Sequence, residues 1–102
     1  MPFADGMTIT DEPGIYVSDR FGVRIENVLL AHEDGATDFG KFLAFETLTL
    51  CPIDLRPVEK ELLTGEEIAW INAYHDRVRA ALLPLLANSA DKDWLEAATR
   101  HI

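Results

Sequence analysis

Hydrophobic and polar positions alternate along the first half of the chain, which is typical of strands with one buried face. Residues 23–30 give the strongest such pattern, and Pro13-Gly14 separates two shorter stretches at residues 7–10 and 15–17. Residues 42–53 are also extended in character. The polar, glycine-containing stretch 32–41 predicts a loop.

The second half of the chain has helical spacing instead. Thr64 and Glu67 match a capping box, in which a threonine and a glutamate three residues on satisfy free backbone N–H groups. Apolar residues then recur every three or four positions until Pro84, which predicts a kink or stop. Residues 93–99 predict a last short helix, and residues 57–62 one helical turn. Strands followed by helices indicate an α+β fold, with antiparallel strands and two or three C-terminal helices.

The composition of the chain argues against some classes of function and adds little about the fold. The chain has 102 residues and a net charge of −9, without a basic stripe, which argues against binding to nucleic acid or an anionic membrane. One cysteine, Cys51, excludes a disulfide within the chain and suits a reducing cytoplasm. We divide the chain into residues 1–38, which carry the candidate chemistry, and residues 39–102, which have a structural pattern.

Two carboxylates, Glu12 and Glu26, carry the most specific signal in the chain. They lie fourteen positions apart on predicted strands with a turn between them, so the chain folds them toward each other. Two convergent carboxylates can hold part of the shell of a divalent cation. Alternatively, Glu12 is a solvated turn residue and Glu26 is simply paired with Arg24, which shares its strand face. Arg24 therefore either neutralises Glu26 or orients it as a metal ligand.

The remaining candidate residues have no partners in the sequence. His32, His75 and His101 show no metal-ligand spacing, so each is expected to be structural or solvated. Ser18 and Ser89 lack an accompanying histidine and acid, which gives a hydrolytic triad no support.

Longer motifs resemble a known family. Residues 6–16, which contain Thr10-Asp11-Glu12-Pro13-Gly14, and residues 21–27, which contain Arg24-Ile25-Glu26-Asn27, closely resemble the last two metal-ligand motifs of Xaa-Pro aminopeptidases, a branch of the pita-bread metallopeptidases. Residues 45–54 and 63–75, with Trp94-Leu95, are similar to the C-terminal extension of the long, cytosolic-type subgroup. The resemblance covers essentially the whole chain.

The resemblance implies a C-terminal piece of a pita-bread fold and a role for three residues. Members of this family hold two divalent ions, commonly manganese, with two Asp, one His and two Glu. Glu26 would match the bridging carboxylate and Glu12 the terminal ligand that also shuttles a proton, while Arg24 would support them without touching the metal. The implied reaction removes the N-terminal residue from peptides whose second residue is proline, and a homodimer through the C-terminal extension is implied as well.

The family's other ligands lie upstream of these motifs, and no residue of this chain replaces them. We therefore expect a fragment of a longer enzyme that is inactive alone and binds metal weakly or not at all. The alternatives are a structural or dimerisation module and a catalytically dead homologue of the same fold.

Overall fold

The computed structural model describes residues 2–102 and forms two compact units, one ending at Thr49 and the other spanning Leu50–Ile102. The first unit holds all the strands and the second the helices, which confirms the predicted α+β class. The first predicted segment, residues 1–38, ends inside the first unit, and its Met1 lies outside the described residues.

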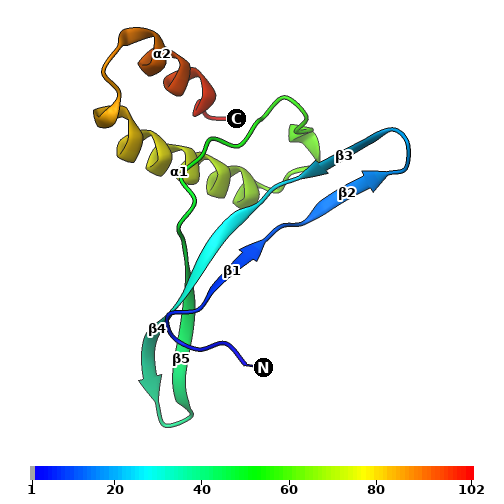
Figure 1. Cartoon of the computed structure of the whole chain (residues 1–102). Helices are drawn as coiled ribbons and strands as arrows, with labels where there is room; N and C mark the ends of the chain where they lie inside the picture. Colours follow the sequence, from blue (N-terminus) through cyan, green and yellow to red (C-terminus); the bar gives the residue numbers. More distant parts are fainter. Residues whose placement is uncertain (1) are drawn as a thin grey trace. The chain divides into compact units, whose positions relative to one another are not determined.

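The first unit consists of antiparallel strands. A three-stranded sheet has the order β1-β4-β5, and β2 pairs with β3 in a second, two-stranded sheet. Figure 1 shows β1 and β2 following each other along one side of a long ribbon, with β3 and β4 along the other. The five strands are β1 (Thr8–Asp11), β2 (Gly14–Val17), β3 (Phe21–Arg24), β4 (Asn27–Thr37) and β5 (Gly40–Thr47).

The same register runs through both pairs of this ribbon. Asp11 of β1 pairs with Asn27 of β4, and Gly14 of β2 pairs with Arg24 of β3. Two residues on each side separate these pairs, and the Ile25 amide donates to the Pro13 carbonyl at 3.2 Å. The ribbon therefore continues without a bulge across the gap between the two sheets.

The β2–β3 hairpin depends on glycine at a position of close approach. Its turn includes Asp19 with a φ of 57°, a conformation that aspartate tolerates better than most residues. The Tyr16 ring lies across Gly22, its cross-strand partner, where an added Cβ would come within 2.7 Å of the ring. A side chain at Gly22 would displace this ring.

The prediction of a loop at residues 32–41 is wrong. Most of this stretch belongs to β4 and β5, with a register shift between Glu33 and Gly35 and a tight turn near Gly40. Its polar composition fits an exposed two-stranded ribbon, in which backbone hydrogen bonds pair the strands. An ion pair between Lys41 Nζ and Glu33 Oε2, at 2.8 Å, spans the two strands.

The second unit is built on α1 (Gly65–Leu82) and α2 (Ser89–Ala98), with short 3₁₀ turns η1 (Lys60–Leu62) and η2 (Leu83–Leu85). The predicted capping box at the start of α1 is confirmed: Thr64 Oγ1 accepts from the Glu67 amide at 3.2 Å, and Glu67 Oε2 accepts from the Thr64 amide at 2.7 Å. Pro84 lies in η2, immediately after α1, as its lack of an N–H requires.

The core of the second unit lies between the two helices and the preceding segment. Tyr74, Val78 and Leu95 are buried, and partly buried leucines pack around them. His75 is fully buried, and its Nε2 accepts from the Ile53 amide at 3.0 Å. Its Nδ1 therefore carries the proton and donates to the Arg100 carbonyl at 3.3 Å.

Among the described residues, no helix is both long and apolar enough to cross a membrane.

Candidate metal site on the paired strands

The site is built from side chains on one face of the ribbon. Extending the shared register across the gap places Glu12, just after β1, directly opposite Glu26, which lies between β3 and β4. Residues directly opposite in an antiparallel pair have Cβ atoms about 5 Å apart, and like charges there repel. Two carboxylates in this arrangement need a cation between or beside them.

Arg24 supplies that cation in this structure. Its Nη1 lies 3.1 Å from Glu12 Oε2, and its Nε lies 3.3 Å from Glu26 Oε2. The cross-strand partner of Arg24 is Gly14, which the Tyr16 ring covers, since a Cβ there would lie 2.7 Å from the Tyr16 hydroxyl oxygen. Arg24 therefore pairs with both carboxylates and contacts one oxygen of each, while its role in orienting a metal ligand stays a prediction.

These three side chains are not buried. Their exposed fractions are 48% for Arg24, 45% for Glu12 and 39% for Glu26. Exposed ion pairs of this kind contribute about 1 kcal/mol or less to stability. The ion pairs therefore position the carboxylates and contribute little to the stability of the fold. Because Glu26 is partly exposed, its carboxylate keeps contact with water and carries no large desolvation penalty.

A fourth residue joins the site without having been predicted. Thr10 Oγ1 donates to Glu12 Oε1 at 2.8 Å. Thr10 precedes Glu12 by two residues, so the alternation of side chains along a strand puts both on one face. That spacing is the signal in the sequence that could have identified it.

The donor set fits part of a metal site. Carboxylate oxygens suit manganese, magnesium or calcium, but such ions take about six ligands. Within residues 2–102, no group of three or more His, Cys, Asp and Glu side chains could hold a metal. His75 has both ring nitrogens engaged in the second unit, and His101 pairs with Asp76 there. The residues present can supply two ligands and the groups that orient them.

The strongest electrostatic shifts lie away from this site. Hydrogen bonds from Arg56 lower the pKa of Asp54 to about 2, and the same pairing raises the pKa of Arg56. The pKa of Glu67 is lowered by the hydrogen bonds from the Thr64 backbone and hydroxyl. A hydrogen bond to Glu33 raises the pKa of Lys41. Each shift reports a structural ion pair or helix cap.

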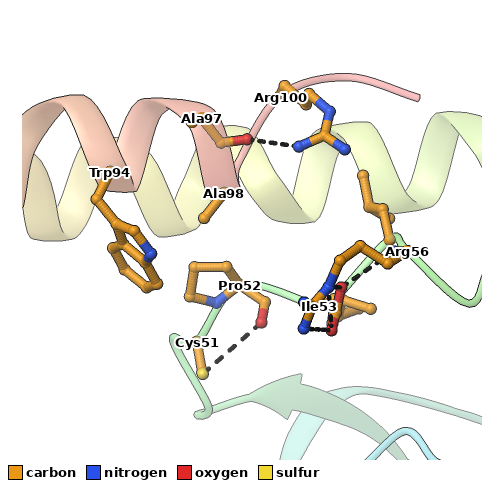
Figure 2. A pocket seen from close by; sticks show the side chains of 10 residues that line it. Cys51, Pro52, Ile53, Arg56, Trp94, Ala97, Ala98 and Arg100 are labelled. Atoms are coloured by element: carbon orange, nitrogen blue, oxygen red, sulfur yellow. Dashed lines mark hydrogen bonds and ion pairs between the residues drawn. The ribbon is translucent and has the colours of Figure 1, made fainter.

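A pocket of about 460 Å³ in the second unit offers no catalytic alternative. Figure 2 shows Trp94 of α2 facing the segment that holds Cys51 and Pro52, with Arg100 at another part of the wall. Arg100 Nη1 donates to the Ala97 carbonyl at 3.0 Å. The described lining contains no histidine, and its one carboxylate, Asp54, is paired with Arg56.

Comparison with known proteins shows that the sequence is similar to the C-terminal part of several peptidases. The family described as "C-terminal region of peptidase_M24" matches residues 41–102. Aminopeptidase P1 of Lotus japonicus is 42% identical over 105 residues, which cover 100% of this chain and 16% of the relative. Xaa-Pro aminopeptidase 1 of Dictyostelium discoideum is 41% identical, covering 89% of this chain and 15% of the relative.

A solved structure shows the same fold. X-prolyl aminopeptidase from Caenorhabditis elegans, described as a cytosolic enzyme with a di-nuclear active site, superimposes with a TM-score of 0.80 at 35% sequence identity. The match covers 98% of this chain and 17% of that one. The chain thus spans about one sixth of the length of these relatives, and its strands and helices correspond to part of a pita-bread peptidase. The chain belongs to the peptidase M24 family, of which it carries the C-terminal region.

Proposed function

We propose that this chain is the C-terminal part of a dinuclear-metal aminopeptidase that removes the N-terminal residue from Xaa-Pro peptides, with Glu12 and Glu26 as two of its metal ligands. The observation that carries the proposal is the cross-strand pairing of these carboxylates around Arg24, at 3.1 and 3.3 Å. The likeness to an X-prolyl aminopeptidase with a di-nuclear active site supports it.

Each residue has a distinct role in this proposal. In the metal-loaded parent, Glu26 would be a ligand shared by the two ions, and Glu12 would be a ligand of one ion whose carboxylate also accepts and passes on a proton. Arg24 holds one oxygen of each carboxylate and leaves lone pairs for ligation, since a carboxylate has about four acceptor positions. Two divalent ions, which we propose to be manganese, would lower the pKa of a bound water and polarise the scissile carbonyl.

The chain alone supplies too few ligands for this reaction. Two carboxylates bind a divalent ion weakly, so we propose that the 102-residue chain is inactive without the remaining ligands of a full-length parent. We place that parent in the cytosol, where the C. elegans enzyme is described to act.

A homodimer is the second part of the proposal. Large apolar side chains are exposed on the second unit, including Trp94 at 64%, Leu85 at 77% and Trp70 at 51%. Trp94 and Leu85 line one hollow together with Leu82, Leu86, Leu95 and one charged residue, Asp91. Contiguous apolar surface of this kind marks an interaction site, and we propose that it contributes to a dimer of the parent.

The experiment compares hydrolysis of an Xaa-Pro peptide with Mn²⁺ present by the 102-residue chain and by the full-length parent. We expect only the parent to cleave, and Glu12→Gln or Glu26→Gln to lower its kcat/KM by about a thousandfold or more, because several kcal/mol of charge stabilisation is lost. Glu46→Gln, an exposed carboxylate on β5, is the matched control. Wild-type rates in both site variants would refute the ligand assignment.

A further inference from the structure

Thr10 and Arg24 hold Glu12 from opposite oxygens. The Thr10 hydroxyl donates to Oε1 at 2.8 Å, and Arg24 Nη1 donates to Oε2 at 3.1 Å. The two donors come from different strands, β1 and β3. Glu26, by contrast, has one oxygen engaged by Arg24, and the described residues offer its other oxygen no hydrogen bond.

We infer that Thr10 is a positioning residue that fixes the rotation of the Glu12 carboxylate before a metal is bound. The terminal torsion of a glutamate is broad, so an exposed carboxylate held at one oxygen still turns about its last bond. A second donor on the other oxygen removes that freedom. Threonine suits this task because its branched Cβ restricts χ1, which gives the hydroxyl a defined direction from the strand.

The inference rests on the proposed function, since the orientation of Glu12 matters only if its oxygens are ligands. Groups that orient metal ligands typically change metal affinity by about 10- to 100-fold when they are removed. The hydrogen bond is exposed, so its loss should leave the fold intact. Loss of this hydrogen bond should therefore change the orientation of the Glu12 carboxylate without changing the free energy of unfolding appreciably.

The chain provides a matched control for this residue. Thr8 lies two residues earlier on β1, on the same face as Thr10. Their cross-strand partners are also alike, Leu30 for Thr8 and Val28 for Thr10. No hydrogen bond joins the Thr8 side chain to another described residue, so Thr8→Val makes the same chemical change without touching Glu12.

The first test needs no metal. Side-chain NMR relaxation of Glu12 should show lower order in Thr10→Val than in the wild-type chain. Thr10→Ser, which keeps the hydroxyl, should restore most of that order, and Thr8→Val should leave it unchanged. Equal order of Glu12 in Thr10→Val and wild type, with an intact backbone spectrum, would overturn the inference.

The second test uses Mn²⁺ alone, with binding followed through paramagnetic broadening of signals from the ribbon. Thr10→Val should weaken binding about tenfold, while Thr8→Val should bind as the wild type does. Glu12→Gln and Glu26→Gln distinguish the ligand role of the two glutamates from the positioning role of Thr10. If these variants weaken binding and Thr10→Val does not, the role of Thr10 is refuted. If Mn²⁺ broadens the ribbon signals of the wild type and broadens those of both glutamate variants equally, the ligand assignment is refuted instead.

Discussion

Glu12 and Glu26 lie directly across from each other on one antiparallel ribbon, although they are fourteen residues apart in the chain. Repulsion between opposed carboxylates is avoided because Arg24 reaches both of them. The ribbon therefore holds the two carboxylates in place through ion pairs within the chain.

Arg24→Met tests this holding function. The variant should change the free energy of unfolding by about 1 kcal/mol or less, because both ion pairs are half exposed. In the full-length parent it should weaken Mn²⁺ binding about tenfold, since the carboxylates then repel and turn. Arg24→Lys should restore little, because an ammonium is a point charge and lacks the rigid fork that reaches two carboxylates. Metal titration followed by calorimetry measures these effects, and full rescue by lysine would contradict the role of the fork.

Gly22→Ala tests the packing of the β2–β3 hairpin. A Cβ at this position would lie 2.7 Å from the Tyr16 ring, so the ring must move. We expect a loss of about 1 kcal/mol in unfolding free energy, measured by urea denaturation. The double variant with Tyr16→Ala should lose less than the two single variants together, because the clash is gone. Strict additivity would show that the ring does not restrict this position.

Glu67 gives the second unit a specific pH dependence. The Thr64 hydrogen bonds lower its pKa in the folded state. A carboxyl whose pKa is lower when folded stabilises the protein above its unfolded pKa of about 4.3, and this contribution is lost as pH falls through the folded value. Glu67→Gln should therefore reduce stability more at pH 7 than at pH 3, in urea unfolding at both values. Glu66→Gln changes the neighbouring carboxylate, which makes no capping bond, and an equal pH effect in that variant would contradict the assignment.

His75→Ala tests the buried hydrogen bonds that connect α1 to the segments packed on it. The variant removes a fully buried ring and leaves the Ile53 amide without its acceptor. Together the cavity and the unpaired donor should cost about 3 kcal/mol. His101→Ala, which removes an exposed partner of Asp76, should cost about 0.5 kcal/mol or less. Similar denaturation midpoints for the two variants would show that the buried hydrogen bonds of His75 do not stabilise the unit.

Trp94→Asp tests the proposed dimer of the parent. The indole is 64% exposed and lines a mostly apolar hollow with Leu85, so a charge there should oppose association without disturbing the core. Sedimentation velocity should show a dimer for the wild-type parent and a monomer, or a weaker dimer, for the variant. A matched exposed change, Lys92→Asp on the same helix, should leave the dimer intact.

Local signals in the sequence predicted much of this fold. The capping box of Thr64 and Glu67 and the stop at Pro84 depend on neighbouring residues, and both occur where expected. The polar stretch 32–41 was misjudged, because a ribbon held by backbone pairing needs no apolar alternation. Predicted strand 23–30 divides between β3 and β4 at Ile25 and Glu26, which no local signal marks.

The candidate site could be predicted only in part. The motifs identified Glu12, Glu26 and Arg24, and the alternation of side chains put Arg24 on the face of Glu26. The simultaneous contact of Arg24 with both carboxylates follows from the cross-strand register of the ribbon. A register is set by long-range pairing, so one sequence does not reveal it.

The central claim is that Glu12 and Glu26 are metal ligands in the full-length parent. Crystals of the parent grown with manganese, measured at the manganese absorption edge, test it most directly. We predict anomalous peaks within ligand distance of both carboxylates, with Arg24 still contacting their outer oxygens. Peaks at a site that contains neither glutamate would contradict the claim.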